Sequence, residues 1–499
     1  MSTLLNAVLF LPLAGALAAV FLPRGEGAQH KTWALLVSLV NFFLSLGLWF
    51  NFDASRGAPE FQFETSVPWI SSLGISYHVG LDGVALLLVM LTTALSPIVI
   101  LSAWKEVEEH VKEFYIALLV LETAMIGTFA ALDLVLFYVF YEAILVPMYL
   151  LIGVWGSENR IYATVKFFVY TFAASVLMLV AILFVYFHDG GTFDYVAARQ
   201  GLQVTPAAAR WLFWAFALAF MVKVPMFPLH TWLPDAHTAA PTVGSVLLAA
   251  ILLKLGAYGF IRVALPILPE EARQWAPAIA ILAVIAIIYG SLACLAQTDM
   301  KRLIAFSSVG HMGFVMLGIS TFTDVGINAA IVGMVAHGVI TGLLFFLAGS
   351  IQHRYHTREM ARLGGNQKVL PILGGILAFA AIASLGLPGL AGFWGEFMAL
   401  LGSFHPFAGA NLALFRTAMV LGSVGTVLTA GYLLWMLQRV NLGEVPEEWR
   451  EKPFHDADRF ELAAWVPLVL ATLAIGVYPA LVFGATNDSV ALLARVFGG

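Results

Sequence analysis

Cysteine is almost absent from this sequence, since Cys294 is the single one among 499 residues. A lone cysteine excludes an internal disulfide, a cysteine-ligated iron–sulfur cluster and a multi-cysteine zinc site on this chain. Charged residues are also scarce, at 11% against about 25% in soluble domains. The sequence contains no P-loop, no dinucleotide-binding glycine motif after a strand and no Ser/His/Asp arrangement. Any redox centre is therefore expected on other chains.

Basic tracts are missing as well, and the net charge is only −5, so nothing indicates nucleic-acid binding. Hydrophobic residues are abundant, at 61%, and the mean hydropathy is +0.90. The apolar runs have the length of membrane helices, about 20 residues each, which excludes a β-barrel. The run from Leu4 to Leu22 has no basic region before it and no clear cleavage site, so we interpret it as a first span rather than a signal peptide.

These runs predict an all-α polytopic membrane protein with about fourteen transmembrane helices. The expected spans lie near residues 4–22, 32–51, 81–103, 114–132, 134–155, 164–187, 211–227, 242–264, 277–296, 303–322, 328–350, 370–403, 412–437 and 461–483.

Two of the spans contain residues that interrupt a helix. Pro225 and Pro228 follow Lys223 directly, and the overlong run 370–403 contains the glycine- and proline-rich segment 386–392. The two interruptions lie five spans apart, so the units that contain them cross the membrane in opposite directions. This pattern is typical of inverted repeats with paired discontinuous helices.

Two inverted five-helix repeats are therefore expected, each with one discontinuous helix. The predicted organisation is an N-terminal three-helix segment at 1–113, a first repeat at 114–264, a second repeat at 277–437, and a loop with a final transmembrane helix at 438–499.

The distribution of Lys and Arg predicts the orientation. Of these 25 residues, 16 fall in one set of alternate loops, among them Arg24, and 7 fall in the other, among them Arg56 and Arg262, while Lys223 and Lys254 lie inside spans. Cytoplasmic loops carry the excess of positive charge. We therefore expect the richer loops in the cytoplasm and both termini on the outer side.

Six ionisable residues fall near mid-depth of the expected spans. A lysine at the centre of a membrane helix costs about 2.5–3.5 kcal/mol on insertion scales, and such residues usually mark ion pathways. Similar depth predicts a file of titratable groups in the plane of the membrane, and lysine, carboxylate and histidine together suit proton transfer. The six candidates are Glu142, Lys223, Lys254, His311, His337 and Glu396.

Five of the six candidates also have a structural interpretation. Glu142 and Lys223 would form a static buried ion pair, Lys254 would extend its side chain to the interface, and His311 and His337 would be hydrogen-bonded packing residues. Three further polar residues stay without an assigned role: Glu122, His230 and His237.

Three stretches resemble the antiporter-like membrane subunits of respiratory complex I, the proton-translocating NADH:quinone oxidoreductase. They are residues 140–156, 223–245 and 301–313, and the second has every proline of the family motif in place. Three paralogues of this family pump protons. The chain ends too soon after its last span for the L branch, and Glu396 stands where the L and N branches and the multisubunit sodium/proton antiporters have lysine. The sequence therefore resembles the M branch, which is also called the subunit 4 type.

The resemblance implies a non-redox proton-translocating subunit, driven by electron transfer elsewhere. It implies no cofactor on this chain, with NADH, FMN, iron–sulfur clusters and quinone on partner subunits. It also implies the L and N chains as neighbours and the inner membrane of a bacterial cell as the location. The implied roles are a coupled pair at Glu142 and Lys223, a connecting lysine at Lys254, relay histidines at His311 and His337, and an exit-side carboxylate at Glu396.

Three other functions stay open at this point. The sequence does not exclude the homologous subunit of a membrane-bound hydrogenase or formate hydrogenlyase. A subunit of a multisubunit cation/proton antiporter would lack the expected lysine at position 396. A purely structural scaffold would leave pumping intact when all six candidates are neutralised.

Overall fold

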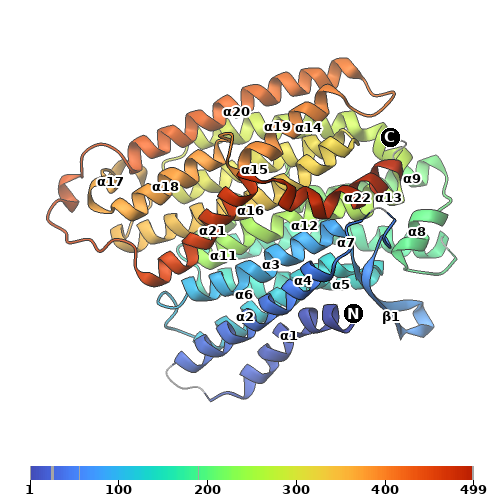
Figure 1. The fold of residues 1–499 in the computed structure, drawn as a ribbon, viewed down its shortest axis with the longest axis horizontal. Coiled ribbons are helices and arrows are strands. Elements are labelled where there is room, and N and C mark those ends of the chain that lie inside the picture. Colours follow the sequence, from blue (N-terminus) through green and yellow to red (C-terminus); the bar gives the residue numbers. More distant parts are fainter. Residues whose placement is uncertain (1, 24–26, 56, 189, 497–499) are drawn as a thin grey trace. The chain divides into compact units, whose positions relative to one another are not determined.

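Long helices make up most of the chain, as Figure 1 shows. The computed structural model describes residues 2–23, 27–55, 57–188 and 190–496. Within these ranges, twelve helices are long and apolar enough to cross a membrane. Arg24 and Arg56, which were counted in the predicted loops, lie outside the described residues.

The twelve helices agree with the predicted spans. They are α1 (Ser2–Phe21), α2 (Ala28–Asn51), α3 (Gly83–Ser102), α4 (Val111–Ala130), α5 with α6 (Leu134–Ala143 and Leu145–Trp155), α7 (Arg160–His188), the segment Thr242–Ile267, α14 (Pro269–Leu295), α15 (Met300–Ser320), α16 (Asp324–Tyr355), α20 (Leu412–Val440) and α21 (Arg459–Val477).

The other two predicted spans are interrupted helices. The first consists of α9 (Pro206–Lys223) and α10 (Trp232–Ala239), and the second of α18 (Pro371–Ser384) and α19 (Ala391–Phe404). Proline removes a backbone donor and clashes with the preceding turn, and Pro225 and Pro228 lie in the first gap. Gly386 and Gly389 in the second gap have φ of +83° and +94°, a conformation that favours glycine. The prediction of an all-α polytopic membrane protein is confirmed, with twelve candidate membrane spans among the described residues.

One helix-length segment is not a uniform α-helix. Thr242–Ile267 consists of α11 (Thr242–Leu247), the π-helix η2 (Leu248–Leu252), α12 (Leu253–Gly259), the π-helix η3 (Phe260–Ala264) and α13 (Leu265–Ile267). Short π-helical turns occur often at functional sites.

The remaining described elements are short, except for the 17-residue helix α22. They are β1 (Gln62–Ile70), η1 (Ser71–Leu73), β2 (Ile75–Leu81), α8 (Tyr195–Gly201), η4 (Met360–Arg362), α17 (Asn366–Val369), η5 (Glu447–Trp449) and α22 (Ala480–Val496).

An antiparallel hairpin of β1 and β2 is an addition to the predicted helical fold. The strands pair from Gln62 with Leu81 to Ile70 with Ile75. The last span also ends earlier than residue 483, because α21 stops at Val477 and α22 begins at Ala480. Pro479 lies between them, and the residue before a proline disfavours helical backbone.

The described chain forms two compact units. Unit 1 comprises residues 1–224, 251–276 and 484–499, and unit 2 comprises residues 225–250 and 277–483. Within unit 1, α1 packs against α2 and α4, as the blue helices of Figure 1 show. Within unit 2, α16 packs against α15 and α19. The inverted repeats at 114–264 and 277–437 stay a prediction.

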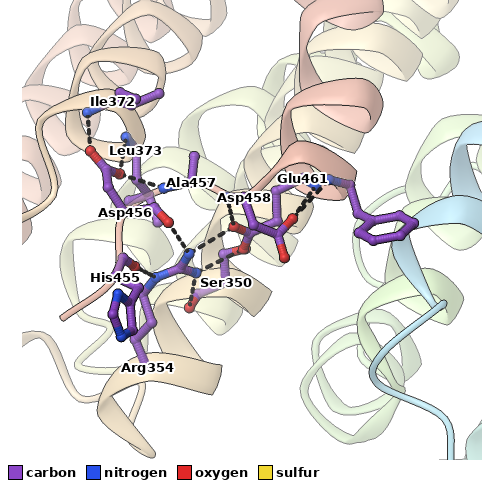
Figure 2. A network of polar contacts seen from close by, with 10 residues as sticks. Ser350, Arg354, Ile372, Leu373, His455, Asp456, Ala457, Asp458 and Glu461 are labelled. Carbon is purple, nitrogen blue, oxygen red and sulfur yellow. Dashed lines mark hydrogen bonds and ion pairs between the residues drawn. The ribbon is translucent and has the colours of Figure 1, made fainter.

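A polar network fastens the ends of three helices in unit 2, and Figure 2 shows it around Arg354. Arg354, near the end of α16, donates two hydrogen bonds of 2.7 Å to the carboxylate of Glu461 in the first turn of α21. Asp456 accepts hydrogen bonds from the backbone N–H groups of Ile372 and Leu373, at 2.7 and 3.1 Å, and so caps α18. The network therefore holds α16, α18 and α21 at one end.

A buried ion pair in unit 1 contradicts the assignment of Arg262 to a loop, which was used in the Lys and Arg count. Arg262 was assigned to an outer loop, but it lies in η3 with only 2% of its surface exposed. Its guanidinium pairs with Asp82, which is 1% exposed and caps α3 by accepting from Ala85 N–H at 2.8 Å. The assignment of Arg262 to a loop was wrong because hydropathy alone does not locate a charge that has a buried partner.

Candidate functional site

Lys223 is the last residue of α9, at the point where the first interrupted helix breaks. Its side chain is 1% exposed, and its Nζ has no hydrogen-bond partner among the described residues. The Nζ lies 4.8 Å from the ring centroid of Tyr141 and 6.0 Å from that of Phe167. Aromatic faces attract a cation without accepting a conventional hydrogen bond. The ammonium is thus held in place while its three protons remain unengaged by protein acceptors.

Glu142 lies in unit 1 with Lys223, next to Tyr141 on α5. The helix is irregular just after it, at Ile144, and Pro147 cannot donate the backbone hydrogen bond that would span this point. Glu142 is half-buried, and Ser175 on α7 lies within hydrogen-bonding range of its carboxylate. No direct hydrogen bond joins Glu142 to Lys223, although the two charges interact electrostatically. The geometry therefore differs from a tight static ion pair.

Lys254 belongs to α12, the short α-helical segment between the π-helices η2 and η3. It is fully buried, at 0% exposure, so its side chain does not extend to an interface as the structural interpretation required. Gly256 explains how α12 approaches α9. A Cβ at Gly256 would lie 2.6 Å from the Phe220 carbonyl oxygen and 2.7 Å from the Val224 nitrogen. Only glycine allows the backbone that follows Lys254 to pack so closely against the end of α9.

Unit 2 brings His311 and Glu396 into direct contact. His311 Nδ1 on α15 lies 2.9 Å from Glu396 Oε1 on α19, and both side chains are about nine-tenths buried. The other ring nitrogen, Nε2, lies 3.0 Å from the hydroxyl of Ser384, the last residue of α18. Both nitrogens of His311 are therefore engaged by groups on the two halves of the second interrupted helix.

His337 faces the same region from α16. Its ring centroid lies 5.8 Å from that of His311, and the residue is 6% exposed. A cavity of about 30 Å³ is lined by His311, His337, Thr341, Ser384 and Glu396 together with apolar and glycine residues. Three of the six predicted residues, His311, His337 and Glu396, therefore line one cavity.

Glycine residues line this cavity and allow the helices around it to approach closely. A Cβ at Gly395 would lie 2.6 Å from the Cα of Gly333, so α19 and α16 touch there through backbone. A Cβ at Gly386, in the interruption, would lie 3.2 Å from Glu396 Oε2. The interruption thus gives the carboxylate of Glu396 its space.

The residues without an assigned role have plain structural settings. Glu122 on α4 is 1% exposed and accepts a hydrogen bond of 2.8 Å from Asn41 Nδ2 on α2. His237 stacks on Phe345 with ring centroids 4.5 Å apart, and His230 lies edge-on to Tyr289 at 4.9 Å. These contacts suit packing and fastening of helices.

The structure adds two residues that sequence reasoning missed, Ser384 and Thr341. Serine and threonine are common in membrane helices, and no spacing signal marks these two. The described residues contain no group of three or more His, Cys, Asp or Glu side chains that would hold a metal ion.

Comparison with known proteins shows to which family this chain belongs. The family model described as "NADH:quinone oxidoreductase/Mrp antiporter, TM" matches residues 131–429, which include all six predicted residues. This chain belongs to that family.

Within the family of NADH:quinone oxidoreductase and Mrp antiporter membrane subunits, the chain is similar over its full length to proteins named as one subunit. It is 46% identical to NADH-quinone oxidoreductase subunit M of Rhodobacter capsulatus, over 99% of this chain and 97% of that relative. It is 38% identical to NADH-ubiquinone oxidoreductase chain 4 of Marchantia polymorpha, over 98% and 97%. The predicted resemblance to the M branch is confirmed.

Two solved structures match this family member in fold. A chain of respiratory complex I from Thermus thermophilus has a TM-score of 0.88 and 30% identity, over 99% of this chain and all of that chain. A chain of the Mrp complex from Dietzia has a TM-score of 0.84 and 21% identity, over 99% and 52%. The second likeness concerns the fold alone.

Proposed function

We propose that this chain is a proton-translocating, non-redox membrane subunit of a complex I-type NADH:quinone oxidoreductase. The observation that carries the proposal is Lys223, a buried ammonium with no hydrogen-bond partner among the described residues, at a helix interruption and next to the carboxylate-bearing helix α5. A residue with a purely structural role would normally have its donors satisfied. Full-length relatives named subunit M support the same assignment.

In unit 1, Glu142 and Lys223 act as a coupled pair. The charge of Glu142 stabilises the Lys223 ammonium across a gap instead of through a fixed hydrogen bond. Protonation of Glu142 removes this stabilisation and favours release of a proton from Lys223. Lys254, which is buried and lies on a segment packed closely against α9, is the next acceptor.

In unit 2, His311, His337 and Glu396 form the second set of groups. His311 exchanges protons with Glu396 through the 2.9 Å contact of Nδ1 and Oε1. Imidazole gains a proton at one nitrogen and loses one at the other, so it relays without moving. Glu396 at the start of α19 is the carboxylate from which the proton leaves.

The electron-transfer chemistry belongs to partner subunits. We assign no cofactor to this chain and place NADH, FMN, iron–sulfur clusters and quinone on other chains of the complex. The L and N chains are the proposed neighbours in the membrane. The proposed location is the bacterial inner membrane, with both termini on the outer side.

Substitution of the coupled pair tests this function. Lys223→Ala or Glu142→Gln in the assembled enzyme should lower NADH-driven proton uptake and coupled quinone reduction by about tenfold or more, since a positioned proton-transfer group contributes roughly 10²–10⁴-fold. Proton uptake by reconstituted vesicles and NADH oxidation would be measured together. Lys112→Ala is the matched control, because Lys112 Nζ bonds backbone carbonyls of Val20 and Leu22 at 2.6 and 2.8 Å and lies outside the proposed set.

Normal turnover with normal proton stoichiometry in both variants would contradict the proposal. Sodium-dependent transport by vesicles that lack any NADH dehydrogenase would favour an antiporter instead. Co-purification with hydrogenase subunits in place of the NADH-oxidising ones would favour the hydrogenase-type assembly.

A further inference from the structure

The hydroxyl of Thr341 departs from the usual behaviour of threonine in a helix. A threonine inside a helix commonly donates to the carbonyl four residues earlier. Buried threonines of this chain do so, with Thr92, Thr429 and Thr472 donating at 2.7 to 3.0 Å. Thr341 on α16 is 1% exposed, and its Oγ1 has no hydrogen-bond partner among the described residues. An unmade hydrogen bond by a buried hydroxyl is destabilising, so this position calls for a ligand.

Thr341 lines the cavity of unit 2. It follows His337 by one helical turn, and side chains four residues apart lie on the same face of a helix. The cavity has a volume of about 30 Å³, and one buried water needs at least about 10–15 Å³ of such space together with two to four polar partners. The site is therefore large enough for about two water molecules, and its walls supply a hydroxyl from Thr341, a hydroxyl from Ser384 and the carboxylate of Glu396.

The two histidines need an intermediary. The nitrogens of His311 are engaged by Glu396 Oε1 at 2.9 Å and by Ser384 Oγ at 3.0 Å. The ring centroids of His311 and His337 are 5.8 Å apart. With both His311 nitrogens engaged by other groups, a proton on His337 reaches His311 only through Ser384 or Glu396, by way of the cavity.

We propose that Thr341 is a positioning residue that orders two water molecules between His337 and the Ser384–His311–Glu396 group. The first water accepts a proton from protonated His337 and passes one of its own to the second water, which passes one to Ser384 Oγ. The Ser384 hydroxyl proton moves to His311 Nε2, while His311 Nδ1 gives its proton to ionised Glu396. One proton has then moved from His337 to Glu396, and each water and hydroxyl has its original number of protons.

The inference rests on the proposed proton-translocating function and deepens it. Its test is removal of the hydroxyl at constant volume in the assembled enzyme. Thr341→Val should lower NADH-driven proton uptake about fivefold, the factor expected from loss of one ordinary hydrogen bond, and should raise the D₂O isotope effect on the coupled rate. Thr341→Ser restores the hydroxyl and should stay within twofold of the wild type. Thr472→Val is the matched control, since that buried hydroxyl donates to the Leu468 carbonyl at 2.8 Å.

The outcomes distinguish a failure of the role proposed for Thr341 from a failure of the proposed proton-translocating function. Wild-type pumping by Thr341→Val beside impaired Lys223→Ala overturns the role of Thr341 alone. Equal impairment of Thr341→Val and Thr341→Ser also overturns it, because then packing and not the hydroxyl matters. Wild-type pumping by Lys223→Ala overturns the proposed function itself. Should the valine variant not assemble, Thr341→Ala takes its place in the same comparison with serine.

Discussion

At the scale of single residues, unit 1 handles two buried cations in opposite ways. Arg262 pairs directly with Asp82, and its guanidinium also lies 4.9 Å from the ring centroid of Phe61. Lys223 has aromatic neighbours too, but within the part of the chain that the structure describes no acceptor hydrogen-bonds to its Nζ. A guanidinium in proteins does not give up its proton, whereas a buried lysine does so readily. The paired arginine is therefore suited to fixing structure, and the lysine is suited to transfer.

The Asp82–Arg262 pair gives a prediction about stability. Asp82→Asn keeps the cap of α3, because asparagine caps a helix as well as aspartate does, but it leaves Arg262 buried and uncompensated. We expect a loss of about 3–5 kcal/mol, as for other buried pairs with one partner removed. Thermal unfolding of the assembled complex would show a lower midpoint for this subunit and less assembled enzyme.

The double variant Asp82→Asn with Arg262→Met serves as its control. Removal of both charges should recover much of the loss, because no uncompensated charge remains. Equal stability of Asp82→Asn and the wild type would show that the pair contributes nothing.

Residue identity predicted some contacts of the site and missed others. The six ionisable residues stood out because a charge in an apolar run is expensive, and three of them, His311, His337 and Glu396, do line one cavity. Ser384 and Thr341 gave no such signal, since a hydroxyl in a helix usually bonds its own backbone. Arg262 was predicted to lie in a loop, because its partner Asp82 is 180 positions away in the sequence and no sequence pattern connects the two residues.

At the scale of elements, the hairpin β1–β2 is fastened by a histidine with two carboxylates. His78 on β2 lies 2.7 Å from Asp194, the N-cap of α8, and 2.8 Å from Glu64 on β1. Burial of the imidazole lowers its pKa, but the contacts with Asp194 and Glu64 outweigh burial and raise the pKa of His78 above its ordinary value of 6.5. The hairpin is thus held by a charged group outside the membrane-spanning helices.

This arrangement predicts a pH dependence. A group with a raised pKa in the folded state contributes stability that is fully present below its unfolded pKa, about 6.5, and is lost as the pH rises through the folded pKa. The hairpin should therefore open more easily at pH 9 than at pH 6. Hydrogen exchange of residues 62–81 in the complex, corrected for the intrinsic rate at each pH, would measure the change.

His78→Gln is the control for the hairpin. We expect about fivefold lower amide protection than the wild type at pH 6, corresponding to roughly 1 kcal/mol for a pair whose carboxylates are partly exposed and screened by solvent. The two proteins should converge at pH 9. The same difference at both pH values would contradict a role for the imidazolium.

Elements were predicted from sequence with unequal success. Apolar length located the spans, and Pro225, Pro228 and the glycines near position 386 located both interruptions. The hairpin was missed because its strands alternate weakly and most of β1 is exposed. The π-helical turns beside Lys254 were missed because no residue type forces a π turn, which depends on tertiary packing.

At the scale of the whole molecule, the family assignment and the distribution of Lys and Arg together support the proposed orientation of the chain in the membrane. The loop that contains Arg450 and Lys452 is one of the loops proposed to face the cytoplasm, and the segment after α8 is proposed to face outward. Cys294 is the single cysteine and is buried, so introduced cysteines can be labelled selectively.

The proposed orientation predicts the labelling pattern. In a Cys294→Ser background, Glu451→Cys should react with a membrane-impermeant thiol reagent only when the cytoplasmic side is open, and Gln203→Cys should react from the outside of intact cells. Both positions are exposed, so accessibility to solvent does not limit the reaction. The reverse pattern would place the termini in the cytoplasm.

The π-helical turns on either side of Lys254 have a consequence for comparisons between chains. A π turn uses more residues than an α turn, and one extra residue rotates the following side chains by about 100° around the helix axis. With such a turn before and after it, α12 has its own angular phase within Thr242–Ile267. A helical projection that treats this segment as a uniform α-helix would therefore place Lys254 on the wrong face.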